Sequence, residues 1–102
     1  MKSTDDFFLW IDNLDRSIRM RVDQRLQRLN SGNPGFHKRF DGILELKWKA
    51  GVMGSFRVYL TEVEGFILLL GGHKDKQSKD IKLAKKILLG VKDGTTRIQD
   101  YE

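Results

Sequence analysis

Two lysines, an arginine and a tyrosine alternate with apolar residues along two neighbouring stretches, and these side chains are the best suited to chemistry. The first stretch, residues 43–49, alternates apolar residues with Glu45, Lys47 and Lys49. The second stretch, residues 55–61, alternates apolar residues with polar ones that include Arg57 and Tyr59. Period-two alternation predicts strands with two different faces. If the strands are neighbours, one sheet face gathers all five side chains. Lysine and arginine hold phosphates and tyrosine stacks on a base, so this face suits a single-stranded nucleic acid.

Two flanking loops supply further cations. Lys38 and Arg39 lie in the loop at 35–41, and His73, Lys74 and Lys76 lie in the loop at 73–76. The loop at 73–76 follows the last strand and can lie at the rim of the basic face. A histidine titrates near pH 6.5, which suits His73 to proton transfer. The face also fits an ordinary solvated surface with cross-strand charge pairs, and the pattern alone does not separate the two interpretations.

Helices at both ends must hold these strands in place. Residues 4–30 carry two apolar stripes at helical spacing, separated at 13–15, and predict an antiparallel helical hairpin. Strands at 43–49, 55–61 and 66–70 with short connections predict an antiparallel meander, followed by a helix from 78 to 90. The second helix also carries several arginines, which we interpret as a solvated face rather than an RNA-binding one. They are Arg16, Arg19, Arg21, Arg25 and Arg28.

Composition narrows the class of protein. The chain has 102 residues, a formal net charge of +5 and no cysteine. This length predicts one domain over residues 1–90, followed by a polar, flexible tail at 91–102. The lack of cysteine excludes a disulfide scaffold and a thiol nucleophile. The first residues are too acidic for a signal peptide and no apolar run would span a membrane, so a cytoplasmic protein without a membrane partner is expected.

Metal and cofactor sites are not indicated. His37 and His73 are the only histidines, and no carboxylate cluster has the spacing of metal ligands. The pair Gly71-Gly72 followed by Lys74 lacks the pattern of a phosphate-binding loop. We therefore expect neither a metal nor a cofactor, and interpret Gly71-Gly72 as the end of a strand.

Residues 4–89 carry a series of short motifs. In chain order they are FLWI at 8–11, RLQRL at 25–29, GNPG at 32–35, GILEL at 42–46, FRVY at 56–59, LLLGG at 68–72, KDI at 79–81 and AK at 84–85. Each is weak by itself. In this order and spacing they resemble the RelE/ParE superfamily of bacterial toxins, in particular the HigB-like branch of addiction module killer proteins.

The resemblance implies a small basic α+β protein with an N-terminal helical hairpin packed on a meander of three or four strands and a C-terminal helix. It implies the toxin of a type II toxin–antitoxin pair. Many RelE-like members cleave mRNA in the ribosomal A site without a metal. The expected partners are therefore mRNA, the ribosome and a cognate antitoxin with a helix-turn-helix, through which the complex binds operator DNA.

The resemblance also implies roles for individual residues. Arg57 matches the strand arginine that acts on the scissile phosphate, Lys47 matches a strand lysine, and Lys74 stands where such enzymes have another basic residue. RNA cleavage needs the 2′-hydroxyl deprotonated, the phosphorane charge stabilised and the leaving oxygen protonated. Lys47 or Lys49 would be the base, and His73 would serve as acid or base. The expected RNA-binding residues are Lys49, Tyr59, Lys76, Lys38 and Arg39.

The chain departs from the family pattern at several points. Relatives usually begin with a strand, whereas only residues 1–3 precede the first helix here, so that strand is expected to be shortened or absent. Its loss would leave a sheet edge open for an antitoxin strand or a second copy. Glu45 replaces a basic residue of RelE-like nucleases, and His73 replaces a usual Asp. Two alternatives stay open: a ParE-like inhibitor of DNA gyrase, and a catalytically inactive module that only binds an antitoxin or DNA.

Overall fold

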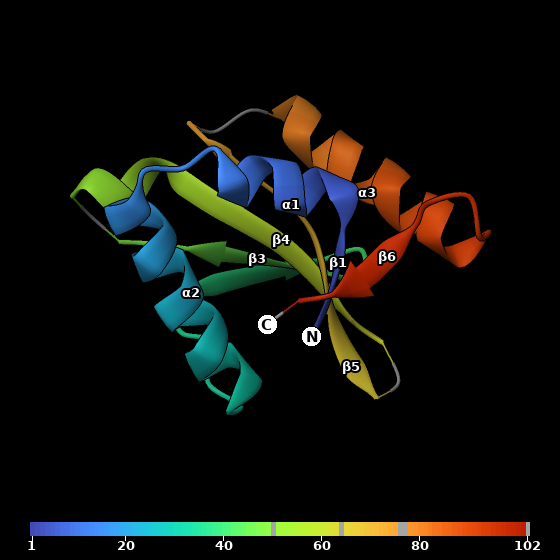
Figure 1. Cartoon of the computed structure of the whole chain (residues 1–102), viewed down its shortest axis with the longest axis horizontal. Coiled ribbons are helices and arrows are strands. Elements are labelled where there is room, and N and C mark those ends of the chain that lie inside the picture. Colours follow the sequence, from blue (N-terminus) through green and yellow to red (C-terminus); the bar gives the residue numbers. More distant parts are fainter. Residues whose placement is uncertain (50, 64, 76–77, 102) are drawn as a thin grey trace.

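The computed structural model describes residues 1–49, 51–63, 65–75 and 78–101. Within them the chain is an α+β protein, as the sequence predicts, with its two termini close together (Figure 1). Its elements in chain order are β1 (Lys2–Thr4), α1 (Asp5–Asp12), α2 (Arg16–Asn30), β2 (His37–Phe40), β3 (Ile43–Lys47), a 3₁₀ turn (Val52–Ser55), β4 (Phe56–Val63), β5 (Phe66–Lys74), α3 (Ser78–Lys92) and β6 (Ile98–Asp100).

The strands form one mixed sheet in the order β2-β3-β4-β5-β1-β6. Strands β2 to β5 are consecutive and antiparallel, which confirms the predicted meander and gives it four strands. Strand β1 lies parallel to β5, and β6 lies antiparallel to β1. The sheet is therefore larger than the meander, because both chain ends contribute a strand.

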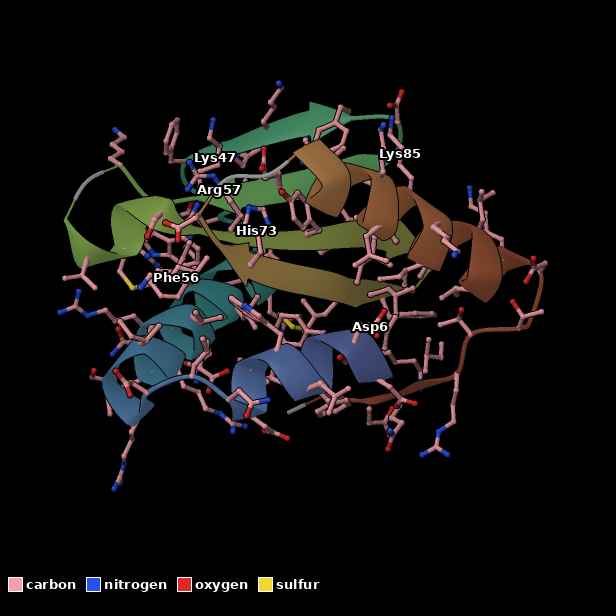
Figure 2. The ribbon with its side chains drawn as sticks, turned by 90° about the horizontal axis from the view of Figure 1, so that it is seen from above. Asp6, Lys47, Phe56, Arg57, His73 and Lys85 are labelled. Atoms are coloured by element: carbon pink, nitrogen blue, oxygen red, sulfur yellow. The ribbon has the colours of Figure 1, made fainter. Side chains whose placement is uncertain are left out.

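Each face of the sheet has its own apolar core. The alternation in β3 sends Leu44 and Leu46 to the core shared with α1 and α2, as predicted. Ile43 and Tyr59 point the opposite way and pack against α3. Helix α3 thus covers part of the face that the sequence pattern suggested was solvated. The meander is covered on both sides, and only the part beyond the start of α3 remains open (Figure 2).

The two N-terminal helices occupy the predicted ranges. Thr4 caps α1, because its Oγ1 atom accepts a hydrogen bond from the Phe7 backbone N–H and donates one to the Leu70 carbonyl. Helices α1 and α2 diverge from each other instead of running side by side (Figure 1). Helix α1 lies along β5, and α2 contributes Val22 and Leu26 to the shared core.

The N-terminal strand is present, although it is short. Strand β1 pairs with β5 through Lys2 and Ser3, and its other side pairs with β6. The sheet edge that the sequence left open for an antitoxin strand is therefore occupied by the chain's own C-terminus. Ser3 and Thr4 are fully buried, which explains why three residues suffice to hold this strand.

The C-terminal residues differ from the predicted flexible tail. Helix α3 continues to Lys92, and Ile98–Asp100 form β6. Tyr101 is 8% exposed and its ring packs edge-on against Phe7, with 5.4 Å between the ring centroids. Local sequence patterns do not predict this arrangement, because β1, the strand with which β6 pairs, lies at the other end of the chain.

Strands β2 and β5 extend through residues expected to be loops. His37–Phe40 pair with β3, and Gly71 and Gly72 lie inside β5 instead of ending it. A Cβ atom on Gly72 would come within 2.5 Å of the Trp10 ring, whereas one on Gly71 would meet nothing within 4 Å. Gly72 is therefore part of the packing of α1 on the sheet.

Candidate nucleic-acid interface

Three predicted site residues lie in one row across the sheet. The register places Lys47 of β3 opposite Arg57 of β4, and Arg57 opposite His73 of β5. Neighbouring strands are about 5 Å apart, so the row spans about 10 Å. Figure 2 shows the three side chains beside the start of α3, where His73 and Arg57 are largely buried. Lys47 and Arg57, which were predicted to share one sheet face, therefore lie directly opposite each other.

Arg57 is held firmly at the centre of this row. Its Nη1 atom donates hydrogen bonds to the carbonyls of Gly54 at 2.8 Å and Phe56 at 2.7 Å. Its Nε atom lies 3.9 Å from Glu45 Oε2. Among the described residues no hydrogen bond engages its Nη2 group. The Arg57 side chain is 13% exposed, so only a small part of it reaches solvent.

A buried polar layer lies beside the row. Glu45 is 6% exposed, and its Oε2 atom accepts a hydrogen bond from the Tyr59 hydroxyl at 3.1 Å. Tyr59 is 2% exposed and stacks on the His73 ring, with 5.3 Å between ring centroids. The prediction that Tyr59 stacks on an RNA base is therefore wrong, because α3 and His73 cover its ring.

His73 reaches the row but does not face solvent. The residue is 7% exposed, and both ring nitrogens are buried. An imidazole in this position cannot exchange a proton with a substrate on the surface. Its contact with Tyr59 instead supports the layer on which Glu45 and Arg57 rest. The expected acid–base role of His73 does not fit this geometry.

Lys49 and Phe36 extend the open part of the row. Lys49 is exposed, and its Nζ atom lies 5.9 Å from the centroid of the Phe36 ring. The Lys47 Nζ atom lies 5.2 Å from the same centroid. Two ammonium groups therefore flank one exposed aromatic ring next to Arg57. We define the basic surface as Phe36, Lys47, Lys49 and Arg57.

The other predicted residues are distributed differently. Lys74 lies opposite Phe56, which points into the core with α1 and α2, so strand alternation directs Lys74 away from Arg57. Arg39 pairs with Leu44 on that same side and forms an ion pair with Glu62 at 3.0 Å. Neither residue joins the basic surface.

Two further predicted RNA-binding residues remain. Lys38 is exposed and lies opposite Glu45, so strand alternation places it on the same sheet face as the basic surface, one row away. Lys76 lies outside the described residues.

Arg25 contributes to this site from below, and its role differs from the predicted solvated face. It is 4% exposed and donates to three backbone carbonyls: Pro34 from both Nε and Nη2, Phe36 from Nη2, and Lys47 from Nη1 at 2.7 Å. Its guanidinium carbon lies 5.0 Å from the centroid of Trp48. Burial and the nearby charge of Arg28 lower the pKa of Arg25. Arg25 therefore joins α2 to the backbone of two basic-surface residues.

Both overlooked residues had a signal in the sequence. Residues 18, 22, 25 and 29 follow helical spacing, so Arg25 falls within the apolar stripe of its helix. Phe36 is an isolated aromatic between Gly35 and three basic residues, where no periodic pattern requires an apolar side chain. Arg25 is thus a charged residue at an apolar position, and Phe36 is an apolar residue in a polar stretch.

The described residues provide neither a metal site nor a membrane-spanning helix. In the described ranges, no group of three or more His, Cys, Asp or Glu side chains is arranged to hold a metal ion. In the same ranges, no helix combines the length and apolarity needed to cross a membrane.

Comparison with known proteins gives a relative but no activity. No protein-family model matches the chain. An uncharacterized protein of Haemophilus influenzae (strain ATCC 51907 / DSM 11121 / KW20 / Rd) is 40% identical over 89 residues, which cover 83% of this chain and 88% of that protein. The chain therefore belongs to the same family as this H. influenzae protein, whose description names no function.

Proposed function

We propose that this chain is a RelE/ParE-like toxin of a type II toxin–antitoxin pair and that it cleaves mRNA on the ribosome without a metal cofactor. The observation that carries the proposal is the cross-strand pairing of Lys47 with Arg57 beside the start of α3. The family resemblance implies that Arg57 acts on the scissile phosphate and that Lys47 matches a strand lysine of RelE-like nucleases. The order of elements, with two helices before a four-stranded meander and one helix after it, also supports a RelE/ParE-like arrangement.

The basic surface is suited to stabilising a pentavalent phosphorane. Arg57 is fixed by two backbone carbonyls, so its Nη2 group can meet a phosphate oxygen with little loss of side-chain entropy. A preorganised cation stabilises the charge that develops on the non-bridging oxygens, which is often the largest single contribution to such catalysis.

The two lysines supply the proton transfers in this proposal. The neutral amine of one lysine takes the proton from the 2′-hydroxyl while the 2′-oxygen forms a bond to phosphorus. The bond to the 5′-oxygen breaks, and the ammonium of the other lysine donates a proton to it. The products are a 2′,3′-cyclic phosphate and a 5′-hydroxyl. Lys47 lies opposite Arg57 in the sheet, and the Lys47 and Lys49 amines both lie close to the Phe36 ring.

An antitoxin is the protein partner that the proposal requires. A neighbouring short reading frame should encode a helix-turn-helix protein that forms a stable complex with this chain and binds operator DNA. The test is co-expression of the two proteins with a tag on one. Recovery of both in a fixed ratio, together with loss of toxicity, is the expected result.

The activity is tested by adding purified protein to a cell-free translation reaction and mapping new mRNA 5′ ends. We expect cuts at fixed positions within codons that require ribosomes. The fragments should carry a cyclic phosphate on one side and a 5′-hydroxyl on the other. Intact mRNA in the presence of folded protein would contradict the nuclease. A loss of DNA supercoiling in a gyrase reaction would then identify the ParE-like alternative.

A further inference from the structure

Phe36 is an exposed aromatic ring at the edge of the basic surface. It is 42% exposed, whereas Phe7 and Phe56 are fully or almost fully buried. Within the described residues, Phe8, Phe40 and Phe66 each pack against one of the two cores, and Phe36 belongs to neither. Water around an apolar ring costs free energy, so packing does not explain this position.

The backbone of Phe36 is nevertheless held in a defined position. Its carbonyl oxygen accepts hydrogen bonds from the Lys47 backbone N–H at 2.9 Å and from Arg25 Nη2. Arg25 is itself buried and also binds the carbonyls of Pro34 and Lys47. The ring is therefore presented to solvent from an ordered, well-connected segment.

The charges around the ring define what it can bind. Lys47 and Lys49 place their ammonium groups 5.2 and 5.9 Å from its centroid, within the range of a cation–π contact. Cations that hold phosphates, combined with an aromatic face that accepts a base, are how single-stranded nucleic acids are bound without sequence readout.

We propose that Phe36 is the stacking platform for one unpaired base of the RNA, with the adjoining phosphates on Lys47, Lys49 and Arg57. The inference rests on the proposed RNA substrate and adds a binding residue to it. Phe36 takes the role that the sequence assigned to Tyr59, whose ring is buried. Arg25 acts as a positioning residue, because it fixes the backbone on which Phe36 and Lys47 both stand.

The test is binding of a fluorescent 2′-O-methyl RNA oligonucleotide, which lacks the attacking hydroxyl, followed by anisotropy at several salt concentrations. Stacking contributes about 1–3 kcal/mol per base, so Phe36→Leu should weaken binding about 5- to 150-fold. Phe36→Trp should bind at least as tightly as the wild type. The slope of log affinity against log salt should not change for Phe36→Leu. It should fall by about 0.7 for Lys49→Ala, which removes a phosphate contact.

A matched control and a matched ligand make the result specific. Phe66 carries a lysine over its ring at 5.9 Å on another part of the sheet, and Phe66→Leu should leave RNA affinity unchanged. The wild type should bind an oligonucleotide with abasic positions as weakly as Phe36→Leu binds the intact oligonucleotide. Combining the variant with the abasic oligonucleotide should cause no further loss of affinity.

The possible failures are distinguishable. If the wild type binds the oligonucleotide and Phe36→Leu binds it equally well, the stacking platform is wrong while the RNA substrate stands. If the wild type does not bind it even at low salt, the stacking platform is overturned, while the proposed nuclease is judged separately by ribosome-dependent cleavage of mRNA. If Phe36→Leu weakens binding of a poly-glutamate peptide as much as binding of RNA, the ring belongs to a protein-docking surface and the inference is overturned.

Discussion

Arg57 and Glu45 form a buried ion pair in which Arg57 Nε lies 3.9 Å from Glu45 Oε2, and their side chains are only 13% and 8% exposed. The carboxylate also accepts the Tyr59 hydroxyl, so the pair joins the surface row to the layer beneath α3. Removing the arginine alone would leave a buried carboxylate without its countercharge, which is usually strongly destabilising. The simplest inactivating mutation is therefore a poor test of catalysis.

We expect Arg57→Gln to lower the free energy of unfolding by about 3–5 kcal/mol. The double variant Glu45→Gln/Arg57→Gln should recover most of that loss, because a neutral amide still accepts the Tyr59 hydroxyl. Urea unfolding of the wild type, both single variants and the double variant gives the coupling energy. Additive effects would show that the two charges do not depend on each other.

The contact between Gly72 and Trp10 gives a second prediction. Gly72→Ala places a methyl group against the indole ring and should destabilise the protein by about 1–3 kcal/mol through overpacking. Gly71→Ala is the matched control, since its Cβ meets nothing within 4 Å. The two variants should differ in thermal midpoint, with Gly71→Ala close to the wild type. Equal midpoints would show that α1 does not pack on β5 in this way.

The hydrogen bonds of the Arg25 guanidinium to three backbone carbonyls give a third prediction. Arg25→Lys keeps the charge, but an ammonium group cannot reproduce the hydrogen bonds that the planar guanidinium donates to three carbonyls. The free energy of unfolding should therefore fall by about 1–3 kcal/mol. Arg28→Lys, one turn along the same helix, is the control and should be nearly neutral. Among folded molecules, Arg25→Lys should also weaken RNA binding, because the Phe36 and Lys47 backbones lose a shared anchor. Unchanged stability and RNA affinity would argue against the positioning role.

Tyr101 gives a prediction about pH. Burial, and then its hydrogen bond to Asp23 at 2.6 Å, raise the pKa of the Tyr101 hydroxyl above its ordinary value. The unfolded chain therefore loses this proton first, from about pH 10. The stabilisation is complete below that pH and is lost as the pH rises toward the folded-state pKa. Tyr101→Phe should be less stable at neutral pH and lose less stability between about pH 9 and 11. Parallel curves for the two proteins would contradict this assignment.

Local patterns predicted much of this fold. Period-two alternation separated Leu44 and Leu46 from Glu45 and Lys47, and the short connections determined the meander. The second core was not predicted, because the alternation shows which residues share a face but not what covers it. The apolar stripe of α3 covers Tyr59, and this turned an expected RNA contact into a core residue.

Non-local contacts account for the remaining differences. Strand β6 is short and polar, and it exists because β1 offers it an edge and Tyr101 reaches Phe7 and Asp23. Arg25 has a charged side chain at an apolar spacing, and only the three carbonyls around it make that burial acceptable. In the candidate site, Lys47 and Arg57 were predictable from strand alternation, whereas Phe36 depends on how the segment before β2 is anchored.

The central claim is that the Lys47–Arg57 surface cleaves RNA, and one comparison tests it most directly. The rate of ribosome-dependent mRNA cleavage should be measured for Glu45→Gln and for Glu45→Gln/Arg57→Gln, after confirming that both are folded. Neither protein carries an unpaired buried carboxylate, so the difference isolates the arginine. We expect Glu45→Gln to cleave mRNA and the double variant to lose at least about 100-fold in rate, as when one preorganised stabilising donor is removed. Equal rates for two folded proteins would contradict the account.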